Sequence, residues 1–209
     1  MNKYFTEFIG TMFLVLVVGI AAIGGQAGAM APVAIGTILM VMVYAGGHIS
    51  GAHYNPAVTF AVLIRKKISI NDAIVYWIAQ IGGAMAAWAI GKFIFDVEGQ
   101  GTSAIKSVEQ GLGAEILGTF ALAYVVLNVA TAKANNGNSF YGLAIGFTVM
   151  TCAFTFGGYS GGAFNPAVAI GASLMKGFIW ADLWIYLVGS LGGALLAGLV
   201  FNMNNPDDK

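Results

Sequence analysis

Residues 8–64 contain no Asp, Glu, Lys or Arg. About a quarter of the residues in a soluble domain are charged, so a water-facing fold could not accommodate this stretch. A membrane-spanning helix needs about 20 apolar residues, and the stretch is therefore long enough for two spans and a further half-length segment. Over the whole chain 58% of residues are hydrophobic and 9% are charged. These values exclude an ordinary soluble protein and a basic nucleic-acid-binding protein, and they predict an integral, multi-pass membrane protein.

Four further stretches without charge follow the first. They cover residues 73–91, 116–132, 134–175 and, at the end of the chain, 183–203. Three are about one span long, and 134–175 is long enough for one span and a half. The sequence therefore predicts an all-α membrane protein with six transmembrane helices and two re-entrant half-helices.

The positive charges predict the orientation of the chain. With six spans, most Lys and Arg residues fall on one side of the membrane: Lys3, Arg65, Lys66, Lys67, Lys133 and Lys209. The connection at about 96–110 lies on the other side and is mainly acidic. Because positive loops stay in the cytoplasm, we expect both termini to be cytoplasmic, with the protein in the cell (inner) membrane.

The chain contains an internal repeat. Residues 50–58 (SGAHYNPAV) return as residues 160–168 (SGGAFNPAV), and residues 7–11 (EFIGT) return as residues 115–119 (EILGT). Each copy holds three spans, and the odd number inverts the second copy relative to the first. We therefore expect a single channel domain over 1–209, built from inverted repeats at about 1–100 and 111–209. In such proteins the transport pathway lies at the repeat interface near the midplane.

Each copy carries an Asn-Pro-Ala motif inside its apolar sequence. The motifs are Asn55-Pro56-Ala57 and Asn165-Pro166-Ala167. Asn is a favoured N-cap and Pro suits the first helical position, so each motif predicts the start of a helix. From Asn55 to Ile64 such a helix would be about 15 Å long, half of the ~30 Å hydrocarbon core.

Two inverted half-helices would meet with their N-termini at the membrane centre. Each end carries about half a positive charge, so the centre repels cations without any ionised side chain. We expect each Asn carbonyl to cap its helix and each amide NH2 to face the lumen. Glycines near the motifs predict non-helical backbone before each half-helix: Gly51, Gly157, Gly158, Gly161 and Gly162.

With these motifs, the chain resembles the aquaporin (major intrinsic protein) family over essentially its full length. The segment SGAHYNPAVT at 50–59 is similar to the family signature, and the second Asn-Pro-Ala follows at the expected place. The resemblance implies one pore per subunit, a homotetramer in the lipid bilayer, and passage of water. The sequence itself has no nucleophile–base constellation, phosphate-binding loop or nucleotide fingerprint, and its two histidines are too few for a metal site. We therefore expect no enzyme activity, no cofactor and no metal, and the low charge predicts no nucleic-acid partner.

The resemblance also implies a narrow filter outside the central constriction. Its four positions correspond to Ile35, Ala153, Gly162 and Val168. Water-selective members typically have an aromatic residue, a His, a small residue and an Arg there. Here Ala153 replaces the His and Val168 replaces the Arg, so the ring should be wider and less polar. A site with few hydrogen-bonding groups discriminates weakly between solutes. Small neutral solutes such as ammonia, urea, glycerol or peroxide could therefore pass together with water.

Other readings of the same residues remain open. Ala169 follows the Arg position, where glycerol facilitators have Asp, and Ile185-Tyr186 ends in an aromatic residue, as in water channels. These positions favour a water channel over a facilitator of glycerol, urea or ammonia. A coupled secondary transporter is the alternative from another class of protein, and it would need ion-binding groups at the midplane. A membrane adhesion or junction protein with the same fold is a third alternative, and its mark would be a sealed pore.

Four other polar residues fall inside or beside the apolar segments. Glu7 and Glu115 occupy equivalent places in the two repeats, where an ionisable residue is a candidate functional site. We expect each to support the backbone before a half-helix, with a proton relay as the alternative. His48 and His53 flank the first re-entrant loop. A structural or vestibule role is expected for them, with pH gating as the alternative.

Overall fold

A computed structural model describes residues 1–102 and 104–208, and regular structure within these ranges is entirely helical. The long helices are α1 (Asn2–Val17), α2 (Ala31–Ser50), α4 (Ile70–Phe95), α5 (Val108–Val126), α6 (Tyr141–Ser160) and α8 (Leu183–Asn204). The short ones are α3 (Pro56–Ile64) and α7 (Pro166–Leu174). Helices α1 and α5 continue as π-helical turns, Val18–Ile23 and Leu127–Thr131, and single 3-10 turns lie at Gly28–Met30, Lys133–Asn135 and Trp180–Asp182.

Six helical segments in the described part of the chain are long and apolar enough to cross a membrane. Their lengths are 20–26 residues and their mean hydropathies 1.3–2.2. The six predicted spans and the two half-helices are thus confirmed.

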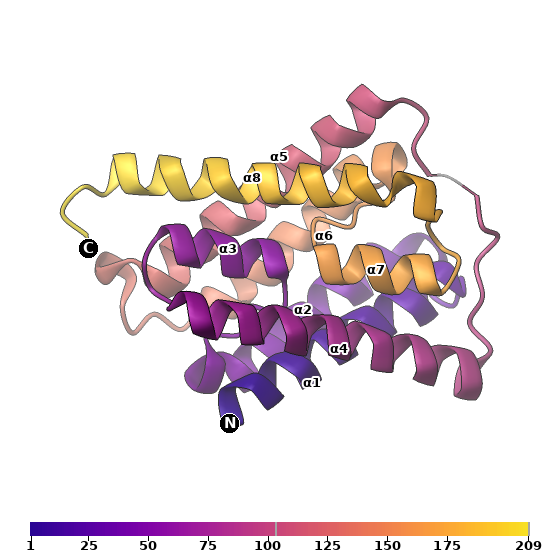
Figure 1. Ribbon diagram of the computed structural model, residues 1–209, viewed down its shortest axis with the longest axis horizontal. Helices are drawn as coiled ribbons and strands as arrows, with labels where there is room; N and C mark the ends of the chain where they lie inside the picture. The colour runs from indigo at the N-terminus through magenta and orange to yellow at the C-terminus, as the bar shows by residue number, and fades with distance from the viewer. Residues whose placement is uncertain (103, 209) are drawn as a thin grey trace.

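The two halves of the chain build equivalent units. Helix α1 packs against α4, and α5 packs against α8 in the same way, while α2 and α6 join the halves. Figure 1 shows α3 and α7 between α4 and α8, with their N-terminal ends directed toward each other. Both chain termini lie in the left half of the view, with the C-terminus at the end of the long axis. This arrangement positions the two Asn-Pro-Ala motifs together in the interior.

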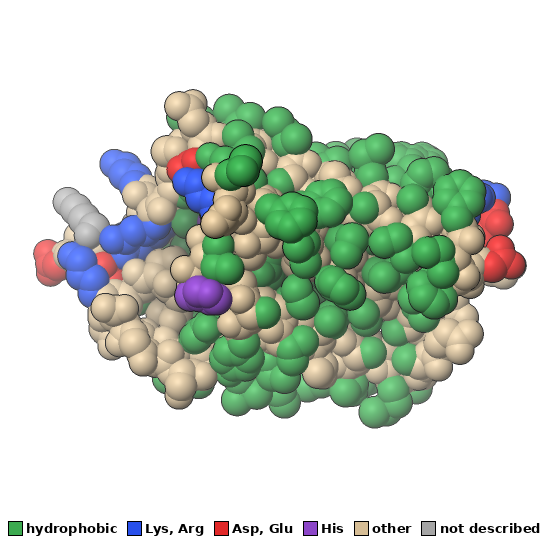
Figure 2. All heavy atoms as spheres, turned by 90° about the horizontal axis from the view of Figure 1, so that it is seen from below, with side chains coloured by type: hydrophobic (Ala, Val, Ile, Leu, Met, Phe, Trp, Pro, Cys, Tyr) green, Lys and Arg blue, Asp and Glu red, His purple; other side chains and the backbone are tan. Residues whose placement is uncertain are grey.

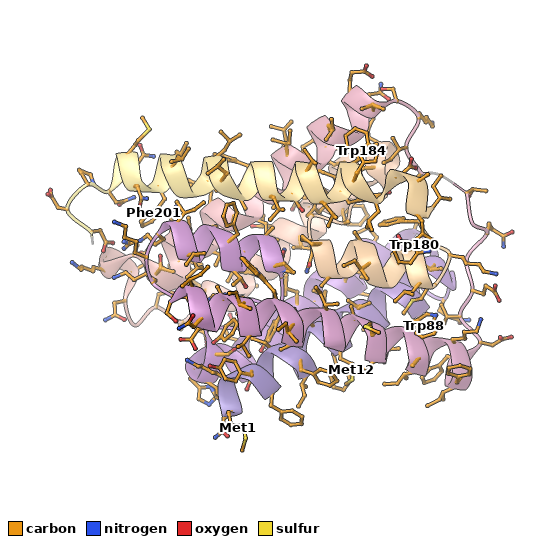
Figure 3. All side chains as sticks on the ribbon, in the orientation of Figure 1. Met1, Met12, Trp88, Trp180, Trp184 and Phe201 are labelled. Atoms are coloured by element: carbon orange, nitrogen blue, oxygen red, sulfur yellow. The ribbon has the colours of Figure 1, made fainter. Side chains whose placement is uncertain are left out.

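The outer surface matches a membrane environment. Hydrophobic side chains cover the middle of the face shown in Figure 2, and charged side chains gather at the two ends of the long axis. Large apolar residues such as Phe5, Ile78 and Phe93 are more than half exposed. In Figure 3, Trp88, Trp180 and Trp184 lie toward the end opposite Met1, as expected of aromatic anchors at one membrane–water interface.

Ionic contacts tie the loops together at the end that holds the termini. The Arg65 guanidinium lies 2.8 Å from the Asp208 carboxylate, which also accepts a 2.8 Å hydrogen bond from the Lys133 backbone N–H. The Lys133 N–H and the Arg65 charge lower the pKa of the Asp208 carboxyl below its ordinary value. Lys3 pairs with Asp72 at the same end, at 2.9 Å.

The predicted cluster of positive loops thus lies at one end of the molecule, although Lys209 falls outside the described residues. At the opposite end Lys176 pairs with Glu98, and the Lys176 charge lowers the pKa of the Glu98 carboxyl.

Glycine allows the closest helix contacts. A Cβ on Gly83 of α4 would lie 2.4 Å from the Phe8 carbonyl oxygen of α1. A Cβ on Gly193 of α8 would lie 2.4 Å from the Ile116 carbonyl oxygen of α5. Backbone cannot yield as a side chain can, so both positions require glycine. Close approach through small residues is how helices associate in lipid, where the hydrophobic effect between helices is absent.

The prediction that Gly157 and Gly158 lie in non-helical backbone is wrong, because both residues lie within α6. The Gly161 N–H donates to the Gly157 carbonyl at 2.8 Å, which continues the helical pattern to the end of α6. The helix ends at Gly161, whose φ of +89° is left-handed, just as α2 ends at Gly51 with φ +84°. A left-handed glycine is a common helix terminator, whereas glycine alone does not stop a helix.

We expect Gly193→Ala to lower the stability of the protein by about 1–3 kcal/mol, the usual effect of overpacking a tight contact. Gly192→Ala is the matched control. Its Cβ would lie 3.9 Å from the Ile116 side chain, an ordinary contact. Thermal unfolding in detergent measures both, and equal unfolding midpoints for the two variants would contradict the assignment of the close contact to Gly193.

Candidate transport pathway

Each half-helix begins at its motif asparagine. Asn55 has extended backbone (φ −157°, ψ 119°), and its Oδ1 accepts hydrogen bonds from the N–H groups of Ala57 (2.8 Å) and Val58 (3.4 Å). Asn165 caps α7 in the same way, with Oδ1 distances of 2.9 and 3.4 Å. Each motif proline occupies the first helical turn, where no N–H donor is needed.

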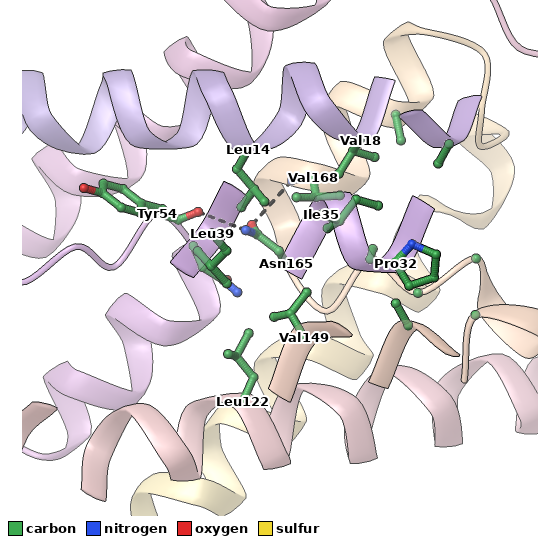
Figure 4. Close-up of a pocket in the computed structure, with 18 of the residues that line it drawn as sticks. Leu14, Val18, Pro32, Ile35, Leu39, Tyr54, Leu122, Val149, Asn165 and Val168 are labelled. Atoms are coloured by element: carbon green, nitrogen blue, oxygen red, sulfur yellow. Dashed lines mark hydrogen bonds between the residues drawn. The ribbon is translucent and has the colours of Figure 1, made fainter. Parts of the chain in front are cut away.

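The two asparagines also join the two re-entrant loops. The Asn55 Nδ2 donates to the Phe164 carbonyl, and the Asn165 Nδ2 donates to the Tyr54 carbonyl, both at 2.9 Å. Figure 4 draws the second of these bonds. The expectation that each amide NH2 is directed wholly into the lumen therefore needs correction. One of its two N–H bonds is used between the loops, because each amide reaches a carbonyl of the opposite repeat, and the second N–H remains for a solute.

The Glu7 carboxylate holds the first re-entrant loop. Its Oε1 accepts from the Ser50 hydroxyl (2.6 Å) and the His53 N–H (2.9 Å). Its Oε2 accepts from the Tyr54 N–H (2.7 Å) and the Gln80 amide (2.8 Å). Glu7 is completely buried, and its two oxygens accept all four of these hydrogen bonds.

Glu115 holds the second loop by the same arrangement. Its Oε1 accepts from the Ser160 hydroxyl (2.6 Å) and the Ala163 N–H (3.0 Å), and its Oε2 accepts from the Phe164 N–H (2.7 Å). Phe164 and the equivalent Tyr54 have positive φ values of 50° and 48°, which are unfavourable for bulky residues. The two buried carboxylates thus fix loop backbone that would not adopt this conformation alone.

We expect Glu7→Gln to destabilise the protein by ~1.5–3 kcal/mol, the usual contribution of a hydrogen bond to a charged group. The new amide would place its own N–H groups against loop donors. Glu109→Gln, at an exposed position in the first turn of α5, is the matched control and should change stability by less than about 0.5 kcal/mol. Thermal unfolding in detergent compares the two. An unfolding midpoint for Glu7→Gln within error of the control would show that the carboxylate does not hold the loop.

A cavity of about 240 Å³ runs along the repeat interface. Both motif asparagines line it, as do all four predicted filter positions: Ile35, Ala153, Gly162 and Val168. In Figure 4 the apolar side chains of Leu14, Leu39, Leu122 and Val149 surround the Asn165 amide. The described residues that line this cavity include no Asp, Glu, Lys or Arg. The cavity is therefore a neutral, mostly apolar passage with hydrogen-bonding groups at its centre.

The four filter positions come from four different parts of the fold. Ile35 lies on α2, Ala153 on α6, Gly162 in the second re-entrant loop, and Val168 in the first turn of α7. All four positions line the same cavity. Figure 4 shows Ile35 and Val168 on the side of Asn165 that faces Pro32.

The two histidines lie in different surroundings. His53 is buried, and its Nδ1 lies 3.0 Å from the Thr59 hydroxyl, beside the first half-helix. His48 is exposed and lines a second cavity of about 400 Å³, together with residues 129–133 and 135–138 of the α5–α6 connection. His53 also lines the transport cavity, next to Tyr54 and Asn55. The structure thus separates the two histidines: His53 borders the transport cavity, and His48 borders the second cavity.

Sequence reasoning did not identify several residues that shape the pathway. The Tyr54 and Phe164 carbonyls receive the asparagine amides, and the Tyr76 and Tyr186 hydroxyls donate to the Ser50 and Ser160 carbonyls, at 2.7 and 2.6 Å. Tyr54 and Phe164 are 110 positions apart in the sequence, as are Tyr76 and Tyr186. The internal repeat could therefore have indicated both pairs. Ile23 of the first π-helical turn and Phe178 also line the cavity, and no pattern indicated them.

Comparison with known proteins agrees with this geometry. The profile of the family described as "Major intrinsic protein" matches residues 1–201. The chain belongs to this family. Its members are passive channels, so the chain is a multi-pass membrane channel and not an enzyme.

Individual relatives fall into more than one branch of the family. The chain is 35% identical to "Glycerol uptake facilitator protein-like 6" of Lactiplantibacillus plantarum, over 100% of both chains. It is 36% identical to "Aquaporin TIP2-1" of Zea mays, over 96% of this chain and 86% of the relative. Its fold is similar to that of the aquaglyceroporin from Plasmodium falciparum, with a TM-score of 0.80 and 22% identity over 96% of this chain and 95% of the other.

Proposed function

We propose that the protein is a passive channel for water that also conducts small neutral solutes. The observation that carries this proposal is the cavity that contains both motif asparagines and the four uncharged filter positions. Its centre receives the N-terminal ends of α3 and α7, and the positive ends of these helices repel cations. The free N–H of each asparagine amide orients a neutral solute by hydrogen bonding.

The absence of Arg at position 168 is the reason to include solutes larger than water. Val168, Ala153 and Gly162 leave a ring with small side chains and no cation. Apolar contacts alone separate solutes by only ~1–3 kcal/mol per methylene-sized difference. A facilitator of glycerol, urea or ammonia is accordingly the second candidate, and a 35%-identical relative is named as a glycerol uptake facilitator.

A coupled transporter is disfavoured by the environment of Glu7 and Glu115. Coupling needs an ion-binding group in the pathway. Both carboxylates are completely buried, both use each oxygen as a hydrogen-bond acceptor, and neither lines the cavity. The same argument disfavours a proton relay through them.

Family membership and the repeat support three further parts of the proposal. Residues 1–209 form one channel domain, with inverted repeats at about 1–100 and 111–209. The assembly is a homotetramer with one pore in each subunit. The protein lies in the cell (inner) membrane with both termini in the cytoplasm, because Arg65, Lys66 and Lys67 lie at the end that holds the termini.

We expect the purified protein to accelerate osmotic shrinkage of liposomes with a low activation energy, since water crosses the pore without entering lipid. Stopped-flow light scattering under gradients of an impermeant solute, glycerol and urea gives water and solute permeability in one series. Water permeability equal to that of empty liposomes, with folded protein present, would contradict the proposal.

We expect Val168→Arg to lower the glycerol-to-water and urea-to-water permeability ratios at least about tenfold, which corresponds to ~1.4 kcal/mol. Arg would extend across a ring otherwise formed by Ile35, Ala153 and Gly162, and it would also raise the barrier to cations. Solute flux and conductance are measured on both proteins. Unchanged ratios would show that position 168 is outside the filter and that the motif region alone sets selectivity.

A further inference from the structure

Two adjacent glycines, Gly157 and Gly158, lie inside the last turns of α6. Glycine in a helix is less stable than alanine because it loses more backbone freedom on folding. Glycine is nevertheless common in membrane helices, where it lets two backbones approach closely. Either a left-handed φ or a close contact would therefore explain these residues.

Neither explanation applies to Gly157. It is not among the described glycines with positive φ, and a Cβ built on it would meet no atom within 4 Å. Gly146 of the same helix is different, because a Cβ there would lie 2.5 Å from the Gly36 carbonyl oxygen of α2. Gly157 therefore faces open space, and the fold does not require it to lack a side chain.

The open space beside Gly157 is the transport cavity. Gly157 lines this cavity, and it lies four residues after Ala153, which places both on one face of α6. The filter residue Gly162 is its neighbour, since a Cβ on Gly162 would lie 3.4 Å from the Gly157 Cα. Gly158 has equally open surroundings, but it does not line the cavity.

We propose that Gly157 is a fifth selectivity-determining position, at which a missing side chain sets the width of the outer pore for uncharged solutes wider than water, such as polyols and amides. The proposal rests on the channel function proposed above. The ring of Ile35, Ala153, Gly162 and Val168 is thus extended by one turn of α6, and at that level α6 presents bare backbone without a Cβ to the cavity.

The test replaces Gly157 by Ala and by Leu, with Gly158→Ala and Gly158→Leu as matched controls. Each pair introduces the same side chain into the same turn of α6, so any effect on helix stability is shared. Water, urea and glycerol permeabilities are measured in proteoliposomes with equal amounts of folded protein. We expect the glycerol-to-water ratio to fall from wild type to Gly157→Ala to Gly157→Leu, at least tenfold in the last, and to remain unchanged in both controls.

Several results would overturn this assignment while leaving the channel function intact. They are equal ratios in all variants, equal losses at positions 157 and 158, or a wild-type protein that conducts water but excludes glycerol and urea. A wild-type protein without any flux would instead contradict the proposed function.

A chemical labelling experiment tests whether position 157 faces the aqueous lumen, without any measurement of flux. The sequence has one cysteine, Cys152, which is buried in α6 and is first replaced by Ala. In this Cys152→Ala background, a water-soluble maleimide should label Gly157→Cys in the folded, membrane-embedded protein, and mass spectrometry detects the adduct. Absence of labelling would show that position 157 does not face an aqueous lumen and would overturn the assignment.

Discussion

Backbone that leaves the helical conformation inside a membrane must find every hydrogen-bond partner within the protein, because lipid offers none and each unpaired group costs several kcal/mol. In this channel two buried carboxylates meet that requirement. Glu7 and Glu115 accept the N–H groups at 53–54 and 163–164, in the loops that precede α3 and α7. A chain with so few charged residues thus buries two of them completely, and the oxygens of both accept hydrogen bonds from loop backbone.

The held loops determine what a solute meets at the centre of the pore. Because the Tyr54 and Phe164 backbone is fixed, their carbonyls are available to the asparagine amides of the opposite repeat. The Oδ1 of each asparagine thereby accepts hydrogen bonds from its own half-helix, and the Nδ2 donates to the loop of the opposite repeat. The pore centre is rigid and symmetric, and it combines two helix N-termini with two remaining N–H donors. In the proposed function, the exclusion of cations follows from this backbone geometry.

The parts of this architecture that depend on local chemistry could be predicted from the sequence. The start of each half-helix was correctly placed at Asn-Pro, because capping and proline geometry act within a few residues. The bond between each asparagine and the opposite loop could not be predicted, since it forms only when two repeats meet. Gly157 was misassigned for a related reason: glycine is compatible with both helix and loop, and the continuation of α6 to Ser160 depends on its packing.

The centre and the filter of the pore therefore differ in how freely they can change. Substitution of Glu7, Asn55 or their repeat equivalents disturbs hydrogen bonds that several segments share. Ala153, Val168 and Gly157 present only a side chain, or the absence of one, to the cavity. Changes at such positions alter width and polarity without moving backbone. One scaffold can consequently serve relatives named as aquaporins and as glycerol facilitators. We propose that the solute range of this chain is set at these side-chain positions, while the motifs at the centre keep the same backbone.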